Sequence, residues 1–157
     1  MVMVDAFFIF GAKYLAFIPL IIAGLFFIKQ RQDKKREIFL VSLISVIFVG
    51  IIAFIAGHLF YNPRPFVIGH FTPLIPHAPD NGFPSDHTLL AAFVASVFTI
   101  YNKRLGIALW IIAVLVAISR VYVEVHHPID VIGSIIISIL GTYLGYLIYK
   151  YKKSKTI

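Results

Sequence analysis

The sequence contains no cysteine and few charged residues. Without cysteine there is no disulfide, no thiolate nucleophile and no metal site with sulfur ligands. Only 13% of the 157 residues are charged, whereas 60% are hydrophobic, and the mean hydropathy is +0.92. A chain of this length cannot bury so much apolar surface in one water-soluble core, so lipid must cover much of it. We therefore predict a single integral-membrane domain over residues 1–157.

Five apolar runs are candidates to cross a bilayer, although the third is short for this purpose. None alternates apolar and polar residues as a membrane β-strand would, and a helix satisfies its own backbone hydrogen bonds in lipid. The sequence thus predicts an all-α bundle of five transmembrane helices. Their approximate limits are 6–28, 38–60, 86–101, 105–123 and 130–149.

Basic residues mark one side of the predicted bundle. They gather in KQRQDKKRE between the first two runs, in NKR between the third and fourth, and in KYKKSK after the fifth. Such flanks are typical of the cytoplasmic side of a membrane, where they also contact anionic lipids. This predicts an outer N-terminus and a cytoplasmic C-terminus in the plasma membrane. The net charge of +7 is interpreted as a topology signal, and no nucleic-acid partner is expected.

The predicted outer side carries the residues whose side chains could take part in a reaction. His126 and Asp130 are four residues apart where the last run begins, and helical spacing puts such a pair on one face. The carboxylate can accept the proton of one imidazole nitrogen and leave the other free as a nucleophile. A structural pair or a metal site would have the same spacing.

Two further features on this side suit phosphate. The PSDH segment at residues 84–87 is typical of a helix start, with Ser85 at the N-cap and His87 in the first turn. Helix N-termini bind anions through their free N–H groups. Arg64 and Arg120 are the only arginines outside the basic segments, and a guanidinium matches phosphate oxygens. Snorkelling to lipid phosphates is the alternative role for both arginines.

Together these segments resemble the type 2 phosphatidic acid phosphatase superfamily, whose signature is K-x6-R-P, P-S-G-H and S-R-x5-H-x3-D. Arg64-Pro65 matches the end of the first motif, residues 84–87 match the second except at its glycine, and residues 119–130 match the whole third. The resemblance covers residues 38–149. The stretches LFYNPRPF, LIPHAPDNGFPSDHT and HHPIDVIGS look like the bacitracin-resistance branch of undecaprenyl-diphosphate phosphatases.

This resemblance implies a metal-independent phosphatase that needs no cofactor. His126 would attack phosphorus and form a phosphohistidine, with Asp130 orienting it, while His87 would protonate the leaving oxygen and then activate water. The phosphoryl oxygens would be held by Arg64, Arg120 and Ser85. The implied substrate is undecaprenyl diphosphate, cleaved at the outer face to the monophosphate and phosphate for recycling of the cell-wall lipid carrier.

The sequence departs from the signature at two positions. The lysine of the first motif corresponds to Gly57, and the glycine of the second corresponds to Asp86, a candidate substrate contact. Lys13, inside the first run, or His58 is a candidate replacement for the missing lysine. Snorkelling to the membrane surface accounts for Lys13 equally well.

The loop at 61–85 contains further polar residues. His77 is a candidate contact for a second phosphate, as are its neighbours His70 and Asp80, although all three can equally shape the loop. A zinc site formed by His70, His77 and His127 is the metal alternative, and its ligand spacing matches no recognised pattern.

Other functions remain open on the sequence. A phosphatidylglycerophosphate or phosphatidate phosphatase would use the same phosphate-binding residues. A transporter or a non-catalytic lipid-binding protein would also place charges in the membrane, but the sequence has no paired broken helices or internal symmetry. The expected partners are a lipid phosphate or diphosphate and membrane lipids, and the sequence does not indicate an oligomeric state.

Overall fold

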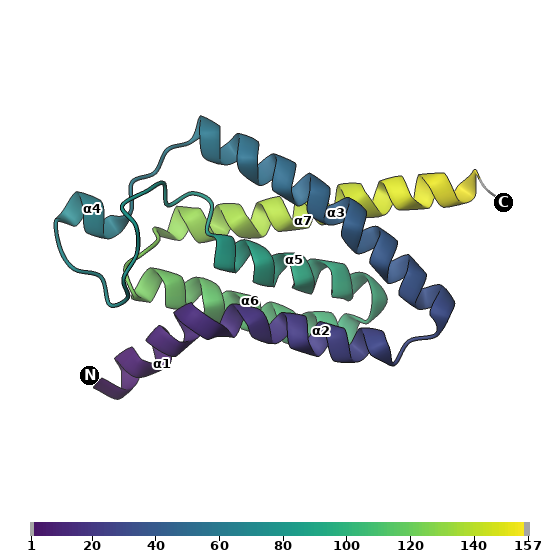
Figure 1. Ribbon diagram of the computed structural model, residues 1–157, viewed down its shortest axis with the longest axis horizontal. Coiled ribbons are helices and arrows are strands. Elements are labelled where there is room, and N and C mark those ends of the chain that lie inside the picture. Colours follow the sequence, from purple (N-terminus) through teal and green to yellow (C-terminus); the bar gives the residue numbers. More distant parts are fainter. Residues whose placement is uncertain (1, 156–157) are drawn as a thin grey trace.

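The computed structural model describes residues 2–155, which form a bundle of helices joined by one long loop and several short ones (Figure 1). No strand occurs among these residues, so the predicted all-α class is confirmed. The helices are α1 (Val2–Tyr14), the 3₁₀ helix η1 (Leu15–Phe17), α2 (Ile18–Ile28), α3 (Gln32–Leu59), α4 (Pro65–Gly69), α5 (Asp86–Tyr101), α6 (Lys103–Tyr122) and α7 (Pro128–Ser154).

Every predicted apolar run is helical, and the protein is a multi-pass membrane bundle. Four segments are long and apolar enough to cross a membrane, namely Val2–Ile28, α3, α6 and α7. The first of these is interrupted at η1, just before Pro19, whose ring cannot donate a backbone hydrogen bond. α5 has only 16 residues. At 1.5 Å per residue it measures about 24 Å, short of a hydrocarbon core of about 30 Å.

α5 lies inside the bundle, and several of its side chains at the helix contacts are small. Ala91, Ala92 and Ala95 are completely buried, and α6 and α7 both pack on this helix. Gly106 of α6 meets Thr99, whose side chain would collide with any added Cβ. Large apolar side chains instead cover the outer faces of α3, α6 and α7, where they are exposed for contact with lipid. Helices in lipid associate through this kind of close van der Waals packing.

α3 and α7 cross at a glycine pair spaced four residues apart. Gly141 packs on the backbone of Val49, and Gly145 packs on Ser45, so a side chain at either glycine would collide with α3. The hydroxyl of Ser45 donates to the Thr142 carbonyl at 3.3 Å. Beyond this crossing the N-terminal part of α3 and the C-terminal part of α7 diverge (Figure 1).

The loop from residue 60 to 85 folds over one end of the bundle and is fastened to itself. Gly82 donates its N–H to the Asn62 carbonyl at 2.8 Å, next to an isolated bridge between Pro63 and Asn81. The Asn81 side chain donates to the Gly57 carbonyl at 2.8 Å, which joins the loop to the end of α3. The loop therefore has a defined path over the start of α5 and α7.

Candidate active site

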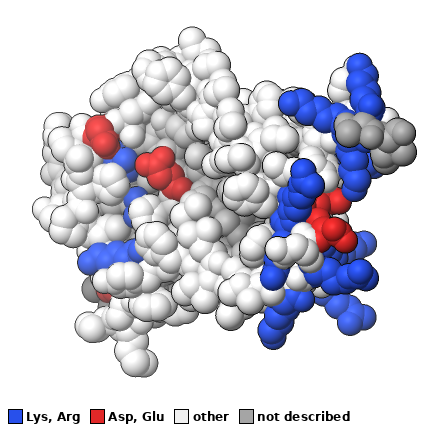
Figure 2. Space-filling model, turned by 45° about the vertical axis from the view of Figure 1, so that its right-hand side comes forward, with Lys and Arg blue, Asp and Glu red and all other residues white. Residues whose placement is uncertain are grey.

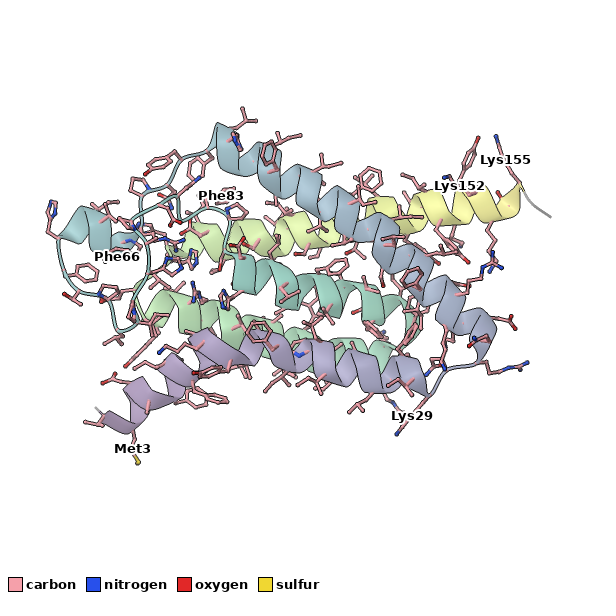
Figure 3. All side chains as sticks on the ribbon, in the orientation of Figure 1. Met3, Lys29, Phe66, Phe83, Lys152 and Lys155 are labelled. Atoms are coloured by element: carbon pink, nitrogen blue, oxygen red, sulfur yellow. The ribbon has the colours of Figure 1, made fainter. Side chains whose placement is uncertain are left out.

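The short connection between α6 and α7 places His126 in a buried polar cluster. The His126 side chain is 2% exposed. Side chains from the long loop, from α6 and from α7 surround it, at the end of the molecule where Figure 3 labels Phe66 and Phe83. Lys152 and Lys155 lie at the opposite end. The structure thus brings the three motif segments together.

The hydrogen bonds of His126 assign its tautomer. Nδ1 lies 2.8 Å from the carbonyl oxygen of Gly82 and 3.4 Å from Oδ2 of Asp130. Since a carbonyl oxygen can only accept, we place the proton of the neutral ring on Nδ1. Nε2 then keeps a free lone pair. α7 begins at Pro128, so His126 lies before the helix. The prediction that His126 and Asp130 share a helical face is therefore wrong, although the Asp130 side chain still contacts His126.

Two buried arginines face this free nitrogen. Nη1 of Arg64 and Nη2 of Arg120 each lie 3.2 Å from Nε2 of His126. Arg64 is 5% exposed and Arg120 is 3% exposed. Two neighbouring buried cations are costly unless hydrogen bonds or an anion compensate them. The arrangement therefore has the electrostatics of an anion-binding site.

The long loop fixes the orientation of Arg64. Its Nε donates to Oδ1 of Asp80 at 2.7 Å, and its Nη1 donates to the Val125 carbonyl at 2.8 Å. Nη2 makes a longer bond of 3.4 Å to the Asn81 carbonyl. These contacts hold the guanidinium against His126, and its ion pair with Asp80 lies toward the surface, since the Asp80 side chain is 60% exposed.

Arg120 is held from the other side of the cluster, by α1. Its Nη1 donates to the Ala12 carbonyl at 3.2 Å. The neighbouring Gly11 lets α1 approach α6, since a Cβ there would collide with Ser119. Nε of Arg120 is buried and has no hydrogen-bond partner among residues 2–155. This N–H group is free to donate to an added acceptor.

Asp130 ties the loop to the start of α7 as well as contacting His126. The residue is completely buried. Oδ1 accepts from Nδ2 of Asn62 at 2.7 Å, and Oδ2 accepts from the His127 backbone N–H at 2.8 Å. Since these bonds are shorter than the 3.4 Å contact to His126, the carboxylate is positioned chiefly by Asn62 and His127.

The start of α5 adjoins the same cluster. α5 begins at Asp86, which puts Ser85 at the N-cap as predicted. However, the Ser85 side chain makes no capping bond and instead accepts a hydrogen bond from Thr88 at 3.2 Å, so the expected side-chain cap is wrong. Ser134 of α7 accepts from the Ser85 N–H at 2.8 Å and donates to the Asp130 carbonyl at 2.7 Å. α5 and α7 therefore start side by side.

His87 lies in the first turn of α5, and its ring packs edge-on against Phe17 at a centroid distance of 6.3 Å. It lies two residues beyond Ser85, which adjoins the cluster. From the long loop, the His77 ring sits 6.2 Å from the His126 ring. These two histidines are therefore brought to the cluster.

Three other candidates lie outside this cluster. Lys13 is exposed and makes no hydrogen bond or ion pair with the described residues. His58 is exposed, contacts the Phe54 carbonyl of its own helix at 2.9 Å and stacks near the Phe54 ring. Asp86 is exposed at the first position of α5. Any role for these side chains stays a prediction.

The residues of the proposed zinc alternative do not converge. His127 lies 3.1 Å from the Pro63 carbonyl through its Nε2, and His70 is exposed at the end of α4. Within the described part of the chain, no three His, Asp or Glu side chains are grouped so that they could hold a metal ion.

Burial and the arginines set the ionisation of the loop residues. Burial lowers the pKa of His126 below 6.5, the hydrogen bond with Asp130 opposes this shift, and the charges of Arg120 and Arg64 lower the pKa further. Burial and Arg64 likewise lower the pKa of His77. Burial alone would raise the pKa of Asp80, but the hydrogen bond from Arg64 and the charges of Arg64 and His77 together outweigh burial and lower that pKa. At neutral pH His126 is therefore a neutral imidazole.

Sequence reasoning missed several residues that position the cluster. Gly82 supplies the carbonyl that His126 contacts, and a Cβ added at Gly82 would lie 2.9 Å from Oδ2 of Asp130. Asn62 and Ser134 position Asp130 and Ser85, and Asn81 fastens the loop. The only signal for Asn62 and Gly82 was their position beside motif residues, in NPRP and NGFPSDH.

Known proteins are similar to this chain in sequence and in structure. Residues 38–154 match the PAP2 superfamily. The undecaprenyl-diphosphatase BcrC of Bacillus subtilis (strain 168) is 30% identical over 148 residues, which are 94% of this chain and 74% of that protein. The crystal structure of Aquifex aeolicus LpxE is similar with a TM-score of 0.69 at 26% identity, covering 91% of this chain and 85% of that one.

A second solved structure is also similar. It is a transmembrane PAP2-type phosphatidylglycerolphosphate phosphatase from Bacillus subtilis, with a TM-score of 0.59 and 25% identity. The likeness covers 96% of this chain and 74% of that one. The similarity therefore extends over the whole bundle and not only over the motifs.

Proposed function

Because the chain belongs to the PAP2 superfamily, we propose that it is an integral-membrane phosphatase that hydrolyses a polyprenyl diphosphate, undecaprenyl diphosphate in particular. One observation carries the chemistry. Nε2 of the buried His126 is the free nitrogen of the ring, and two buried guanidinium groups lie 3.2 Å from it. This combination suits attack on a phosphoryl group whose charge must be stabilised.

The first step makes a phosphohistidine. Nε2 attacks the terminal phosphorus, the new P–N bond forms, and the P–O bond to the lipid monophosphate breaks. The Gly82 carbonyl accepts a hydrogen bond from the Nδ1–H group, and with the nearby Asp130 carboxylate it stabilises the positive charge that the ring gains. Arg64 and the free Nε–H of Arg120 donate to the equatorial oxygens as negative charge spreads over them.

His87, in the first turn of α5, acts in both steps of the proposal. In the first step it gives a proton to the leaving oxygen as the P–O bond breaks. In the second step it removes a proton from the water, whose oxygen bonds to phosphorus as the P–N bond to His126 breaks. The products are the polyprenyl monophosphate and inorganic phosphate, with His126 restored. Backbone N–H groups at the start of α5 add hydrogen bonds to the phosphate, since no side chain caps this helix.

The polyprenyl substrate is supported by the relative with that name, which covers nearly the whole chain. A contact of His77 with the second phosphate is part of this proposal, and it is supported by the 6.2 Å between the His77 and His126 rings. A phosphatidylglycerophosphate phosphatase is the second candidate, supported by the similar solved structure.

The deciding experiment compares turnover of undecaprenyl diphosphate with turnover of phosphatidylglycerophosphate by the purified protein in mixed micelles. The rate of phosphate release measures kcat/KM for each lipid. We expect kcat/KM to be at least tenfold higher for the diphosphate, a difference of about 1.4 kcal/mol in activation free energy. A preference for the glycerolipid would overturn the substrate proposal but not the phosphatase. Acid-labile, base-stable labelling of His126 by a ³²P-labelled substrate separates a phosphatase from a transporter, which forms no such bond.

We also propose that the active site faces outward. Nearly all Lys and Arg residues lie at the other end of the bundle, in the segments expected on the cytoplasmic side. The chain lacks cysteine, so a single His70→Cys variant reports on the loop alone and Lys155→Cys on the opposite end. A membrane-impermeant maleimide should label the first variant in intact cells and the second only after lysis. The reverse pattern would refute this orientation.

A further inference from the structure

The end of the bundle opposite His126 contains a cavity that the phosphatase chemistry does not use. α3 and α7 pack closely at Gly141 and Gly145 and diverge beyond this crossing. A cavity of about 850 Å³ lies between the diverging parts, and Tyr101 from the end of α5 also lines it.

Basic side chains predominate around this cavity. Its lining residues come from the first turns of α3, the end of α5 and the last turns of α7: Asp33, Lys34, Arg36, Glu37, Leu40, Ile44, Tyr101, Tyr149, Lys152 and Lys153. Figure 2 shows Lys and Arg gathered at this end of the molecule, with acidic side chains among them. Glu37 is already paired with Lys153 at 3.0 Å. The lining thus contains four basic residues and two acidic ones.

Two donors at the cavity have no partner in the protein. The Tyr101 hydroxyl is buried and makes no hydrogen bond with the described residues. A buried hydroxyl without a partner is unfavourable, and most such groups in proteins are paired. Arg36 is exposed and forms no hydrogen bond or ion pair with residues 2–155. A guanidinium and a hydroxyl that converge on one cavity suit the oxygens of a phosphate group.

We propose that this cavity binds the phosphate group of an anionic phospholipid. The phosphate oxygens accept hydrogen bonds from Arg36 and Tyr101 and are attracted by Lys34 and Lys152. Leu40 and Ile44 lie further along α3 and give the cavity an apolar wall on the bilayer side, which suits the glycerol and first acyl carbons. This wall favours a lipid over a soluble phosphate. Basic clefts between transmembrane helices bind anionic head groups in this way.

The site is independent of the proposed phosphatase reaction. It shares no residue with the His126 cluster and lies at the other end of the helices (Figure 3). By bridging α3 and α7, a bound lipid would hold together the two helices that diverge here. Binding to the folded state alone would also raise the thermal stability of the protein.

The full-length protein, purified in neutral detergent, is titrated with phosphatidylglycerol and with phosphatidylcholine of the same acyl chains. Native mass spectrometry measures the bound lipid, and Tm is recorded in parallel. We expect phosphatidylglycerol to bind at least tenfold more tightly. The double variant Arg36→Gln/Lys152→Gln should weaken it about 30-fold, on the basis of about 1 kcal/mol for each charge near the surface. Tyr101→Phe should weaken it severalfold and leave phosphatidylcholine unchanged.

The matched control is Lys103→Gln/Arg104→Gln, which removes two exposed charges from the same end but outside the cavity. It should keep wild-type affinity, and both double variants should keep wild-type phosphatase activity in detergent. Equal weakening by the two double variants, or equal binding of the two lipids, would overturn the proposal. Displacement of phosphatidylglycerol by glycerol 3-phosphate or inorganic phosphate at matched concentration would overturn the lipid as ligand in favour of a soluble phosphate.

Discussion

The two ends of the bundle carry the same types of charged side chain in opposite settings. At the His126 end, Arg64 and Arg120 are buried and each donates to backbone carbonyls. At the Lys153 end, most lysines and arginines are exposed, and the ion pair with Glu37 lies at the surface. The bundle thus separates buried positive charge from hydrated positive charge along its length.

This difference indicates where function resides. A buried guanidinium loses its hydrogen bonds to water, which destabilises the folded protein unless neighbouring groups or a ligand replace those hydrogen bonds. An exposed lysine stays hydrated and has almost no desolvation cost, and an ion pair at the surface contributes little to the free energy of folding. Arg120, with a buried donor that has no partner among residues 2–155, is therefore a stronger functional signal than the whole basic segment at the end of α7.

The largest expected effect is the loss of the nucleophile. His126→Ala should lower turnover by about 10⁴-fold or more, because no other group can form the covalent intermediate. Phosphate release measures this, with circular dichroism to confirm the helical fold. The matched control is His70→Asn at the loop's exposed left-handed position (φ 52°), where asparagine is tolerated. Comparable turnover by the two variants would end the assignment of His126.

The next effect compares an arginine at each end. Arg120→Lys keeps the charge but loses the fork that places one N–H group at His126 and another at the Ala12 carbonyl. We expect kcat/KM to fall by about 10²–10³-fold, the usual effect of removing a donor to a transition-state oxygen. Arg36→Lys at the exposed end should leave kcat/KM unchanged. If both substitutions were silent, burial would not be the property that distinguishes the two ends.

Gly82→Ala tests whether the loop carbonyl positions His126. An added Cβ would lie 2.9 Å from Oδ2 of Asp130 and 3.0 Å from the Asn62 carbonyl, so the loop must move. A displacement near 1 Å at a reacting group costs about 10²-fold in rate, and we expect a loss approaching that size. Gly50→Ala is the control, since nothing lies within 4 Å of its Cβ. It should stabilise α3 by about 0.5–1 kcal/mol and keep full activity.

The pH dependence should reflect the buried setting of His126. Only the neutral ring is a nucleophile, so activity is lost as the pH falls through the pKa of His126. Burial and the two arginines lower that pKa, and the acid limb of kcat/KM should therefore have its midpoint below 6.5. The ionisation of the substrate phosphate, with a pKa of about 6, is titrated separately by ³¹P NMR. An enzyme limb above 6.5 after this correction would contradict the assigned environment.

The smallest effect is expected at the surface ion pair. Glu37→Gln removes the partner of Lys153, whose side chain is 56% exposed. Solvent screens such pairs, so the free energy of unfolding should change by less than about 1 kcal/mol. Denaturation in lipid-free detergent measures this change. A loss of several kcal/mol would mean that the exposed end contributes to stability as strongly as the buried one.

Much of the architecture followed from local properties of the sequence. Each apolar run became a helix, because a chain in lipid has no other way to satisfy its backbone. α5 is short, as its apolar run already indicated, but it is also buried, with alanines such as Ala91 inside the bundle rather than exposed to lipid. Composition does not predict this burial, because an apolar run looks the same whether lipid or protein surrounds it.

For the candidate site, too, some features could be predicted from the sequence and others could not. By itself the sequence determined which residues bring chemistry, since His126, Asp130, Arg64 and Arg120 stand at motif spacings. Only the tertiary structure decided that Nδ1 of His126 faces the Gly82 carbonyl, that Asn62 holds Asp130 and that α1 supports Arg120. These partners lie 44, 68 and 108 residues apart in the chain. Spacing within one segment cannot encode such contacts, because they depend on how separate helices and a long loop meet.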